Sequence, residues 1–270
     1  MTTTVVRRRL DAELVRRGLA RSRDHARDLI ESGAVRVQGT EATKVGRQVE
    51  DSASITLRDP DESGWVSRGA HKLLGALAAF PNLSVSDRRA LDAGASTGGF
   101  TQVLLAEGAR EVTAVDVGYG QLAWSVRTDP RVHVLERVNV RHLTPEAVPY
   151  APDLIVADLS FISLRTVMPA LASVAAPVCD LLVMVKPQFE VGRDEVGHGV
   201  VTDPDLRRSA VHGVVTACRE VGLDLRGVAA SPLPGPKGNV EYFVWASRGV
   251  PAPLVDPDEA IARAIAEGPS

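Results

Sequence analysis

Residues 91–100 have the sequence Leu91-Asp92-Ala93-Gly94-Ala95-Ser96-Thr97-Gly98-Gly99-Phe100, and this stretch decides the fold. Its order of residue types predicts the end of a strand, a glycine-rich turn and the start of a helix. Three glycines within six positions let the backbone turn sharply and approach a ligand closely. The N-terminus of the following helix would point at whatever lies on the turn. We therefore interpret the stretch as the nucleotide-type loop of an open α/β sheet.

The spacing of the glycines narrows the choice of ligand. The dinucleotide fingerprint G-x-G-x-x-G would need a third glycine in register, whereas this chain has Gly94-x-x-x-Gly98-Gly99. A phosphate-binding P-loop would need Gly-Lys-Ser/Thr, which does not follow here. A short turn opened by Asp92 suits S-adenosylmethionine (SAM), which carries an amino acid and a ribose but no phosphate. The alternative is a tight strand-to-helix turn without a ligand.

The composition is that of a globular protein. With 270 residues, the chain is long enough for one large domain and a small one, and its 44% hydrophobic residues are enough for a core. No apolar run approaches the roughly 20 residues that a membrane helix needs, so we expect no membrane partner. The two cysteines predict no disulfide framework, which favours a cytoplasmic location. The six histidines lack metal-ligand spacing, so we expect no metal site.

The charge is unevenly distributed along the chain. Residues 1–50 hold 11 Lys and Arg against 7 Asp and Glu, whereas the whole chain has a net charge of −3. A basic N-terminal part joined to an acidic body suggests that the basic part contacts a polyanion. A solvated helical face would explain the same charges.

The first 58 residues have the pattern of a small α+β module. Apolar spacing predicts a helix over 12–17 and another over 23–32, each followed by a glycine. Alternation of apolar and polar residues predicts strands over 34–39 and 54–57. The acidic residues 59–66, which include Pro and Gly, predict a linker.

From residue 89 onward, predicted strands alternate with predicted helices. The predicted strands are 89–92, 111–116, 132–135, 153–157, 180–185, 225–230 and 240–246. Strands separated by helices indicate a parallel sheet, in which ligands lie at the carboxyl ends of the strands. Asp116 ends the second strand, where a ribose-binding carboxylate belongs, and Asn139 follows the third as a candidate for the adenine side.

Four further charged residues lie at the ends of predicted elements: Lys72, Asp158, Lys186 and Glu241. Lys186 directly follows an apolar strand and Glu241 begins another, so solvation alone does not explain them. Lys72 lies near the start of a predicted helix, where a cation is unfavourable. A surface lysine is the simpler interpretation of Lys72 on this observation alone.

Two resemblances to known families add to these observations. The pattern R-L-D-x-x-L-V-x-x-G-L-A-x-S-R-x-x-A-x-x-L-I-x-x-G-x-V-x-V-x-G, from Arg9 to Gly39, resembles the S4 RNA-binding domain. The resemblance implies that arginines of this module face RNA, where their planar guanidinium groups suit phosphates and bases. The RNA-binding candidates are Arg9, Arg16, Arg21, Arg23 and Arg27.

Lys72, Asp158, Lys186 and Glu241 together resemble the Lys-Asp-Lys-Glu tetrad of FtsJ-like ribose 2′-O-methyltransferases. With the S4 module in front, residues 7–247 resemble the TlyA (haemolysin A) family of rRNA 2′-O-methyltransferases. The motifs Asp-Ala-Gly-Ala-Ser-Thr-Gly-Gly-Phe, Asp-Leu-Ser-Phe-Ile-Ser-Leu, Val-Lys-Pro-Gln-Phe-Glu and Gly-Asn-Val-Glu-Tyr carry this resemblance. It implies an α/β Rossmann-like class I SAM methyltransferase fold behind a small α+β S4-like domain. The expected domains are 1–58 (S4-like), 59–66 (linker), 67–250 (methyltransferase) and 251–270 (tail).

The implied activity is SAM-dependent 2′-O-methylation of rRNA, at a cytidine in assembled or nearly assembled ribosomal subunits. The tetrad would be catalytic, with Lys186 either a neutral base or a charged stabiliser of the alkoxide. The cofactor-binding candidates are Asp92, Gly94, Ala95, Ser96, Gly98, Gly99, Phe100, Asp116 and Asn139. Two alternatives remain open, a non-catalytic RNA-binding or ribosome-assembly factor and a membrane-lytic protein.

Overall fold

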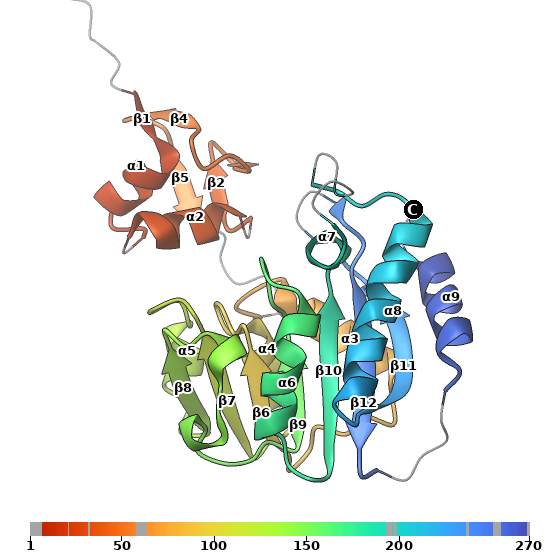
Figure 1. Ribbon diagram of the computed structural model, residues 1–270. Coiled ribbons are helices and arrows are strands. Elements are labelled where there is room, and N and C mark those ends of the chain that lie inside the picture. Colours follow the sequence, from red (N-terminus) through yellow and green to blue (C-terminus); the bar gives the residue numbers. More distant parts are fainter. Residues whose placement is uncertain are drawn as a thin grey trace, which may run out of the picture. The chain divides into compact units, whose positions relative to one another are not determined.

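The computed structural model describes residues 7–20, 22–31, 33–57, 64–192, 196, 199–235, 238–250 and 255–268. Contacts within the chain divide it into two compact units, Met1–Ser67 and Arg68–Ser270. The two units are described separately below (Figure 1).

The first unit is a small α+β domain. Its elements are β1 (Arg7–Arg9), α1 (Leu10–Arg16), α2 (Arg23–Glu31), β2 (Val35–Val37), β3 (Thr40–Glu41), β4 (Gln48–Glu50) and β5 (Ile55–Leu57). β1 pairs with β4, and β2 lies between β3 and β5, all antiparallel. The two helices pack together through fully buried side chains such as Leu10, Leu14 and Ile30.

Local chemistry explains the helix ends of this unit. Gly18 and Gly33 follow α1 and α2 with φ of 72° and 75°, a backbone region that suits glycine. Ser22 caps α2, because its Oγ accepts a hydrogen bond of 3.1 Å from the amide of His25. The predicted helices are therefore confirmed, α1 beginning two residues earlier than expected. β1, β3 and β4 were not predicted, because their residues (RRR, TE and QVE) are almost all polar or charged and show no apolar alternation.

The second unit is built on a seven-stranded sheet. Its strands are β6 (Arg89–Ala93), β7 (Glu111–Asp116), β8 (Val132–Glu136), β9 (Leu154–Ala157), β10 (Cys179–Val185), β11 (Asp224–Ala230) and β12 (Tyr242–Arg248). The strand order is β11-β12-β10-β9-β6-β7-β8. β6 to β10 pair in parallel, as predicted, but β12 pairs antiparallel with both β10 and β11. The sheet is therefore mixed rather than purely parallel.

Helices cover both faces of this sheet, and Figure 1 shows α6 and α8 in front of it and α3 behind it. The helices are α3 (Gly69–Ala79), α4 (Gly99–Ala106), α5 (Trp124–Arg127), α6 (Leu164–Val174), α7 (Pro187–Glu190), α8 (Pro204–Glu220) and α9 (Pro257–Glu267), with 3₁₀ turns at Val140–His142 and Pro145–Ala147. α9 lies in the segment 251–270, which was expected to be a tail. Its Ala260, Ile261 and Ala264 are buried in the same hydrophobic cluster as the strands, so α9 belongs to the core of the second unit.

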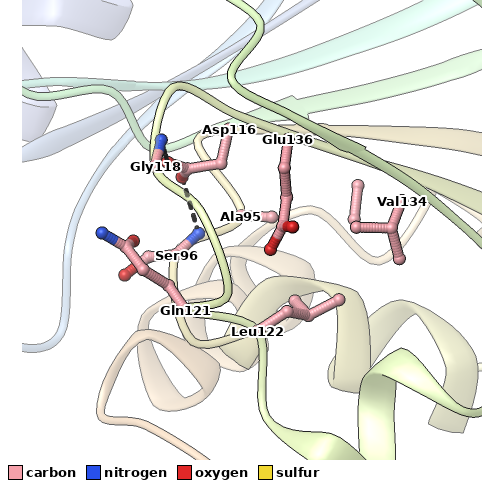
Figure 2. A pocket seen from close by; sticks show the side chains of 9 residues that line it. Ala95, Ser96, Asp116, Gly118, Gln121, Leu122, Val134 and Glu136 are labelled. Atoms are coloured by element: carbon pink, nitrogen blue, oxygen red, sulfur yellow. Dashed lines mark hydrogen bonds between the residues drawn. The ribbon is translucent and has the colours of Figure 1, made fainter. Parts of the chain in front are cut away.

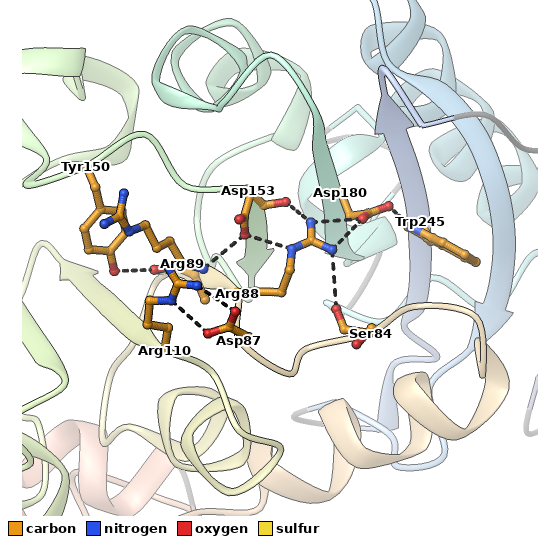
Figure 3. Close-up of polar contacts among 10 residues, drawn as sticks. Ser84, Asp87, Arg88, Arg89, Arg110, Tyr150, Asp153, Asp180 and Trp245 are labelled. Carbon is orange, nitrogen blue, oxygen red and sulfur yellow. Dashed lines mark hydrogen bonds and ion pairs between the residues drawn. The ribbon is translucent and has the colours of Figure 1, made fainter.

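A polar cluster holds the amino-terminal edge of the sheet together (Figure 3). Arg88, just before β6, pairs with Asp153 at 2.8 Å and with Asp180, at the start of β10, at 3.0 Å. Trp245 of β12 donates a hydrogen bond of 2.9 Å to the same Asp180. Arg110 pairs with Asp87 nearby at 2.6 Å. These contacts connect β6, β7, β9, β10 and β12 at the edge opposite the glycine-rich turn.

Candidate active site

The four charged residues that the sequence singled out come together at the carboxyl edge of the parallel strands. Lys72 lies in α3, Asp158 directly follows β9 and Lys186 directly follows β10. Glu241 precedes β12, and Tyr242 pairs with Val185 at the end of β10. Because β12 runs antiparallel, its start lies where the parallel strands end. The strand reversal thus brings Glu241 to the edge that carries the other three residues.

The four residues form two close ion pairs. Lys72 Nζ lies 2.5 Å from Glu241 Oε2, and Lys186 Nζ lies 2.5 Å from Asp158 Oδ1. Lys186 also donates a hydrogen bond of 2.9 Å to the hydroxyl of Ser160. Lys72, Lys186 and Glu241 are buried, with at most 8% of each residue exposed. Buried charges need such partners, because an unpaired charge away from water is strongly unfavourable.

The ion pairs set the protonation states of the cluster. Burial alone would lower the pKa of Lys186, but the carboxylates of Asp158 and Glu241 raise it above the ordinary value. Burial would raise the pKa of Asp158, and the charges of Lys186 and Lys72 lower it instead. Lys186 is therefore an ammonium and Asp158 a carboxylate at neutral pH.

The glycine-rich turn lies beside this cluster and needs its glycines. Gly94 has φ of 87°, and a Cβ there would lie 2.5 Å from the backbone oxygen of Asp158. Gly98 has φ of 96° and precedes α4, where a Cβ would lie 2.9 Å from Leu122. Ser96, between them, also has a positive φ of 48°. The predicted strand, turn and helix are confirmed, and the turn contacts the backbone of Asp158 directly.

Asp92 is a buried carboxyl group at the start of this turn. Its side chain has no exposed surface, and Oδ2 accepts a hydrogen bond of 2.6 Å from Thr101 in α4. Within the described part of the chain, Oδ1 has no hydrogen-bond partner. Burial, with smaller contributions from Asp158 and Asp116, raises the pKa of Asp92 to about 7 against the opposing Thr101 bond. The group therefore titrates near neutral pH.

A pocket opens on the other side of the turn, between the ends of β7 and β8 (Figure 2). Asp116 accepts hydrogen bonds from the amides of Ser96 (2.8 Å) and Gly118 (2.6 Å). Glu136, at the end of β8, faces the same pocket and accepts a 2.5 Å hydrogen bond from the amide of Gly120. The lining residues are Ala95, Ser96, Ala114, Asp116, Gly118, Gln121, Leu122, Val134 and Glu136.

Apart from Gly94 and Gly98 in the turn itself, and Asn139, the cofactor-binding candidates fall into two groups. Ala95, Ser96 and Asp116 line the pocket, whereas Asp92, Gly99 and Phe100 are buried under the turn. Asn139 is exposed at the start of a 3₁₀ turn, where its side chain accepts a 3.0 Å hydrogen bond from the amide of Arg141 and does not line the pocket. Glu136 was not predicted as a site residue. It ends the third strand as Asp116 ends the second, so its position could have indicated a role in the same way.

The predicted RNA-contacting arginines form ion pairs within the first unit. Arg9 and Arg23 both contact the buried Asp11, at 3.1 and 2.8 Å, and Arg16 contacts Glu13 at 2.6 Å. Each of the three side chains remains about half exposed, at 49%, 59% and 47% respectively. Arg27 lies 3.7 Å from Asp24 on the exposed side of α2, and Arg21 lies outside the described residues. The ion pairs therefore hold the arginine side chains in place, while their guanidinium groups remain partly exposed to solvent.

In the described part of the chain, no helix is long and apolar enough to cross a membrane. The same residues contain no group of three or more His, Cys, Asp or Glu side chains arranged to hold a metal ion.

Comparison with known proteins agrees with this geometry. Residues 65–248 match the FtsJ-like methyltransferase family, and residues 8–55 match the S4 domain. The chain is 57% identical to the 16S/23S rRNA (cytidine-2′-O)-methyltransferase TlyA of Mycobacterium tuberculosis, over 97% of this chain and 99% of that protein. It is 35% identical to Hemolysin A of Brachyspira hyodysenteriae, over 87% of this chain and 98% of that protein.

A solved structure of a hemolysin candidate from Streptococcus thermophilus superposes with a TM-score of 0.74 at 35% identity, and covers 98% of this chain and 96% of its own. The match to the methyltransferase family spans well over half of the chain, and the S4 match precedes it. The chain therefore belongs to the S4-containing FtsJ-like methyltransferases of the TlyA family.

Proposed function

We propose that this chain transfers the methyl group of SAM to the ribose 2′-oxygen of a cytidine in ribosomal RNA, in the cytoplasm. The observation that carries the proposal is the pair of buried lysine–carboxylate contacts beside the glycine-rich turn. The relative from Mycobacterium tuberculosis, named for 16S and 23S rRNA, supports the substrate class. The S4 domain supports RNA as the partner rather than a small molecule.

The residues around the turn fit SAM. When bound, SAM supplies an activated methyl group on a positively charged sulfonium. The acids Asp92, Asp116 and Asp158 lie at the carboxyl ends of three neighbouring strands, and Asp92 has a buried oxygen that lacks a partner among the described residues. A cationic amino group and a sulfonium suit this acidic surrounding. Asp116 would accept hydrogen bonds from the ribose hydroxyls, and Ala95 and Ser96 would border the nucleoside.

Lys186 stabilises the reacting oxygen in this proposal. A ribose hydroxyl is a weak acid, so its proton must leave, here to a neighbouring water molecule, as the 2′-oxygen attacks the methyl carbon. The bond from that carbon to the sulfonium breaks in the same step and leaves a neutral thioether, while loss of the proton puts negative charge on the 2′-oxygen. Lys186 is held as an ammonium by Asp158, and a fixed positive charge at that point lowers the energy of the alkoxide. Asp158 and Glu241 hold the two lysines in place. Of the two roles that the sequence left open, the raised pKa of Lys186 favours the charged stabiliser over the neutral base.

The substitution Lys186→Met tests this mechanism, because it removes the charge and keeps most of the volume. We expect methyl transfer from tritiated SAM to ribosomal subunits to fall by about 10²-fold or more, while calorimetry shows unchanged SAM affinity. Transfer within a few-fold of the unmodified protein would remove Lys186 from the mechanism.

The pH dependence of turnover separates the two roles of Lys186. At saturating SAM, where the titration of Asp92 no longer limits cofactor binding, a charged stabiliser gives a rate that stays level through neutral pH and falls at high pH, when the ammonium loses its proton. A neutral base would give a rate that rises with pH over the same range. A rising profile would therefore overturn the stabiliser role while leaving the methyl transfer itself in place.

Mapping 2′-O-methyl groups in rRNA from cells with and without the gene tests the substrate. We expect at least one cytidine to lose its modification when the gene is deleted. Loss of no modification, together with intact RNA binding by the purified protein, would favour the non-catalytic assembly factor.

A further inference from the structure

Glu190 is a buried acid beside the proposed catalytic cluster to which no role has yet been given. It ends α7, four residues after Lys186, and only 6% of it is exposed. It faces the loop 158–163, which follows β9 and carries Asp158. The two segments 158–163 and 186–190 thus hold the two partners of one ion pair.

Glu190 binds the far end of that loop through several contacts. Its Oε2 accepts a hydrogen bond of 2.6 Å from the hydroxyl of Ser163, and its Oε1 accepts one of 2.7 Å from the amide of Leu164, the first residue of α6. The guanidinium of Arg165 donates a 2.7 Å hydrogen bond to the backbone oxygen of Glu190 and lies 3.4 Å from its carboxylate. The Glu190 carboxylate therefore adds to the N-cap that Ser163 forms for α6 and fastens the loop to α7.

The near end of the loop is held by other contacts. The amide of Asp158 donates a 3.0 Å hydrogen bond to the backbone of Ala93 in β6, and Lys186 contacts both Asp158 and Ser160. Between the two ends, Phe161 adopts a positive φ of 65° and is 85% exposed. The loop is thus fixed at its two ends, and in its middle the ring centroid of Phe161 lies 5.2 Å from that of Phe189 in α7.

We propose that Glu190 is a positioning residue, which locks the loop 158–163 to the segment 186–190 and so fixes Asp158 and Ser160 against Lys186 for methyl transfer. The proposal rests on the proposed function and deepens it. Glu190 does not touch the reacting atoms in this proposal, because both of its oxygens are bound to Ser163 and Leu164. Glu190 affects the rate of methyl transfer only by holding the loop 158–163 in place.

Displacements of about 1 Å among reacting groups can cost about 10²-fold in rate, so loosening this loop should be visible in turnover. SAM binding should change less than turnover, because Glu190 does not line the pocket between β7 and β8 and Asp158 is only one of the three acids beside the turn. Glu190→Gln keeps the shape of the side chain, because its amide oxygen can accept from the amide of Leu164 while its amide nitrogen donates to the hydroxyl of Ser163.

The experiment compares Glu190→Ala and Glu190→Gln with the matched control Asp180→Asn. Asp180 is also a buried acid with ion-pair and hydrogen-bond partners, but it lies at the opposite edge of the sheet. Rates are divided by the number of SAM-binding sites measured by calorimetry, which corrects for unfolded protein. We expect Glu190→Ala to lose about 10- to 100-fold in kcat with SAM affinity within twofold, and Glu190→Gln and Asp180→Asn to stay within about threefold.

A second measurement does not depend on activity. Asp158 raises the pKa of Lys186, so a loop that moves Asp158 away should lower it, as measured by NMR titration of the lysine side chain. We expect this shift in Glu190→Ala but not in Glu190→Gln or Asp180→Asn. If Glu190→Ala does not fold, Ser163→Ala removes a single contact with Glu190 and should show a smaller shift in the same direction.

Three results would overturn the positioning role. These are unchanged turnover per site in Glu190→Ala, an unchanged Lys186 titration in the same variant, or an equal loss in Asp180→Asn. A different result marks the failure of the proposed function. If the unmodified protein binds SAM but transfers no methyl group to rRNA, the function is wrong, and the NMR titration still decides whether Glu190 fixes Asp158.

Discussion

The buried carboxyl group of Asp92 makes the second unit less stable as the pH rises toward neutral. Folding raises its pKa from 3.8 to about 7, chiefly through burial. Between these two values the folded state holds a proton that the unfolded state has released. Stability therefore falls with pH across this window, by about 1.4 kcal/mol for each pH unit and about 4 kcal/mol in total. Above pH 7 both states are ionised and the loss is complete.

Asp92→Asn removes this titration and keeps the shape of the side chain. The amide oxygen can still accept the hydrogen bond from Thr101. We expect the variant to be more stable than the unmodified protein, and its advantage to grow by about 3 kcal/mol between pH 5 and pH 8. This corresponds to a further rise in melting temperature of about 5 to 10 °C for a unit of this size. Thermal unfolding in the absence of SAM, at both pH values, measures it.

A matched variant tests whether the effect belongs to Asp92. Thr101→Val removes the hydrogen bond that lowers the pKa of Asp92. The pH window in which stability falls should then extend to a higher pH. The reasoning is refuted if the advantage of Asp92→Asn is the same at pH 5 and pH 8, because a pH-independent gain would come from packing rather than from a buried charge.

Three other substitutions test separate parts of the structure. Gly235→Ala would place a Cβ in steric conflict with Glu241 Oε1, which is buried and paired with Lys72 through its other oxygen. We therefore expect methyl transfer to fall at least about tenfold with SAM affinity kept, as measured by transfer assay and calorimetry. Arg88→Ala leaves the buried aspartate at the start of β10 without its ion-pair partner and should lower the free energy of unfolding in urea by about 2 to 4 kcal/mol, while turnover of the folded fraction is retained. In the first unit, a hydrogen bond from Arg16 holds the pKa of Glu13 at about 2, so Glu13 contributes about 3 kcal/mol above pH 4.5 that is lost as the pH falls toward 2. Hydrogen exchange of this unit should show Glu13→Gln destabilised at pH 7 and equal to the unmodified protein near pH 2, and equal exchange at pH 7 would contradict the assignment.

The sequence was sufficient to predict most strands of the second unit, because these strands are long and apolar. β7 has the predicted bounds, and β6, β8, β9 and β10 differ from the prediction by one residue at an end. The tetrad could be predicted because polar residues at the ends of parallel strands meet at one edge. The direction of β12 could not, since an antiparallel strand has the same apolar pattern as a parallel one. That direction is what brings Glu241 to Lys72.

Residues that act through long-range contacts were missed. Ser160 and Glu190 lie in motifs that were quoted for the resemblance, yet nothing in their spacing shows that Lys186 contacts Ser160 or that Glu190 caps α6. Likewise, the basic charge of the first 50 residues predicted exposed arginines, but not that Asp11 and Glu13 would be buried beneath them. Contacts between loops depend on the packing of the whole sheet, which a local pattern does not contain.

The acidic residues around Asp92 are also brought together by the register of the strands, which a local sequence pattern does not contain. Ala93, the last residue of β6, pairs with Val115 of β7 and with Ala157 of β9, so Asp116 and Asp158 each follow one residue further along. β7 and β9 flank β6, and Asp92 lies two residues before the other two acids in register. The ionised carboxylates still repel one another at this separation, and both neighbours raise the pKa of Asp92. A cationic ligand removes that repulsion, and the ligand-free fold avoids part of it by keeping a proton on Asp92. The same residue that lowers stability above neutral pH is therefore the one whose ionised form favours a positively charged cofactor.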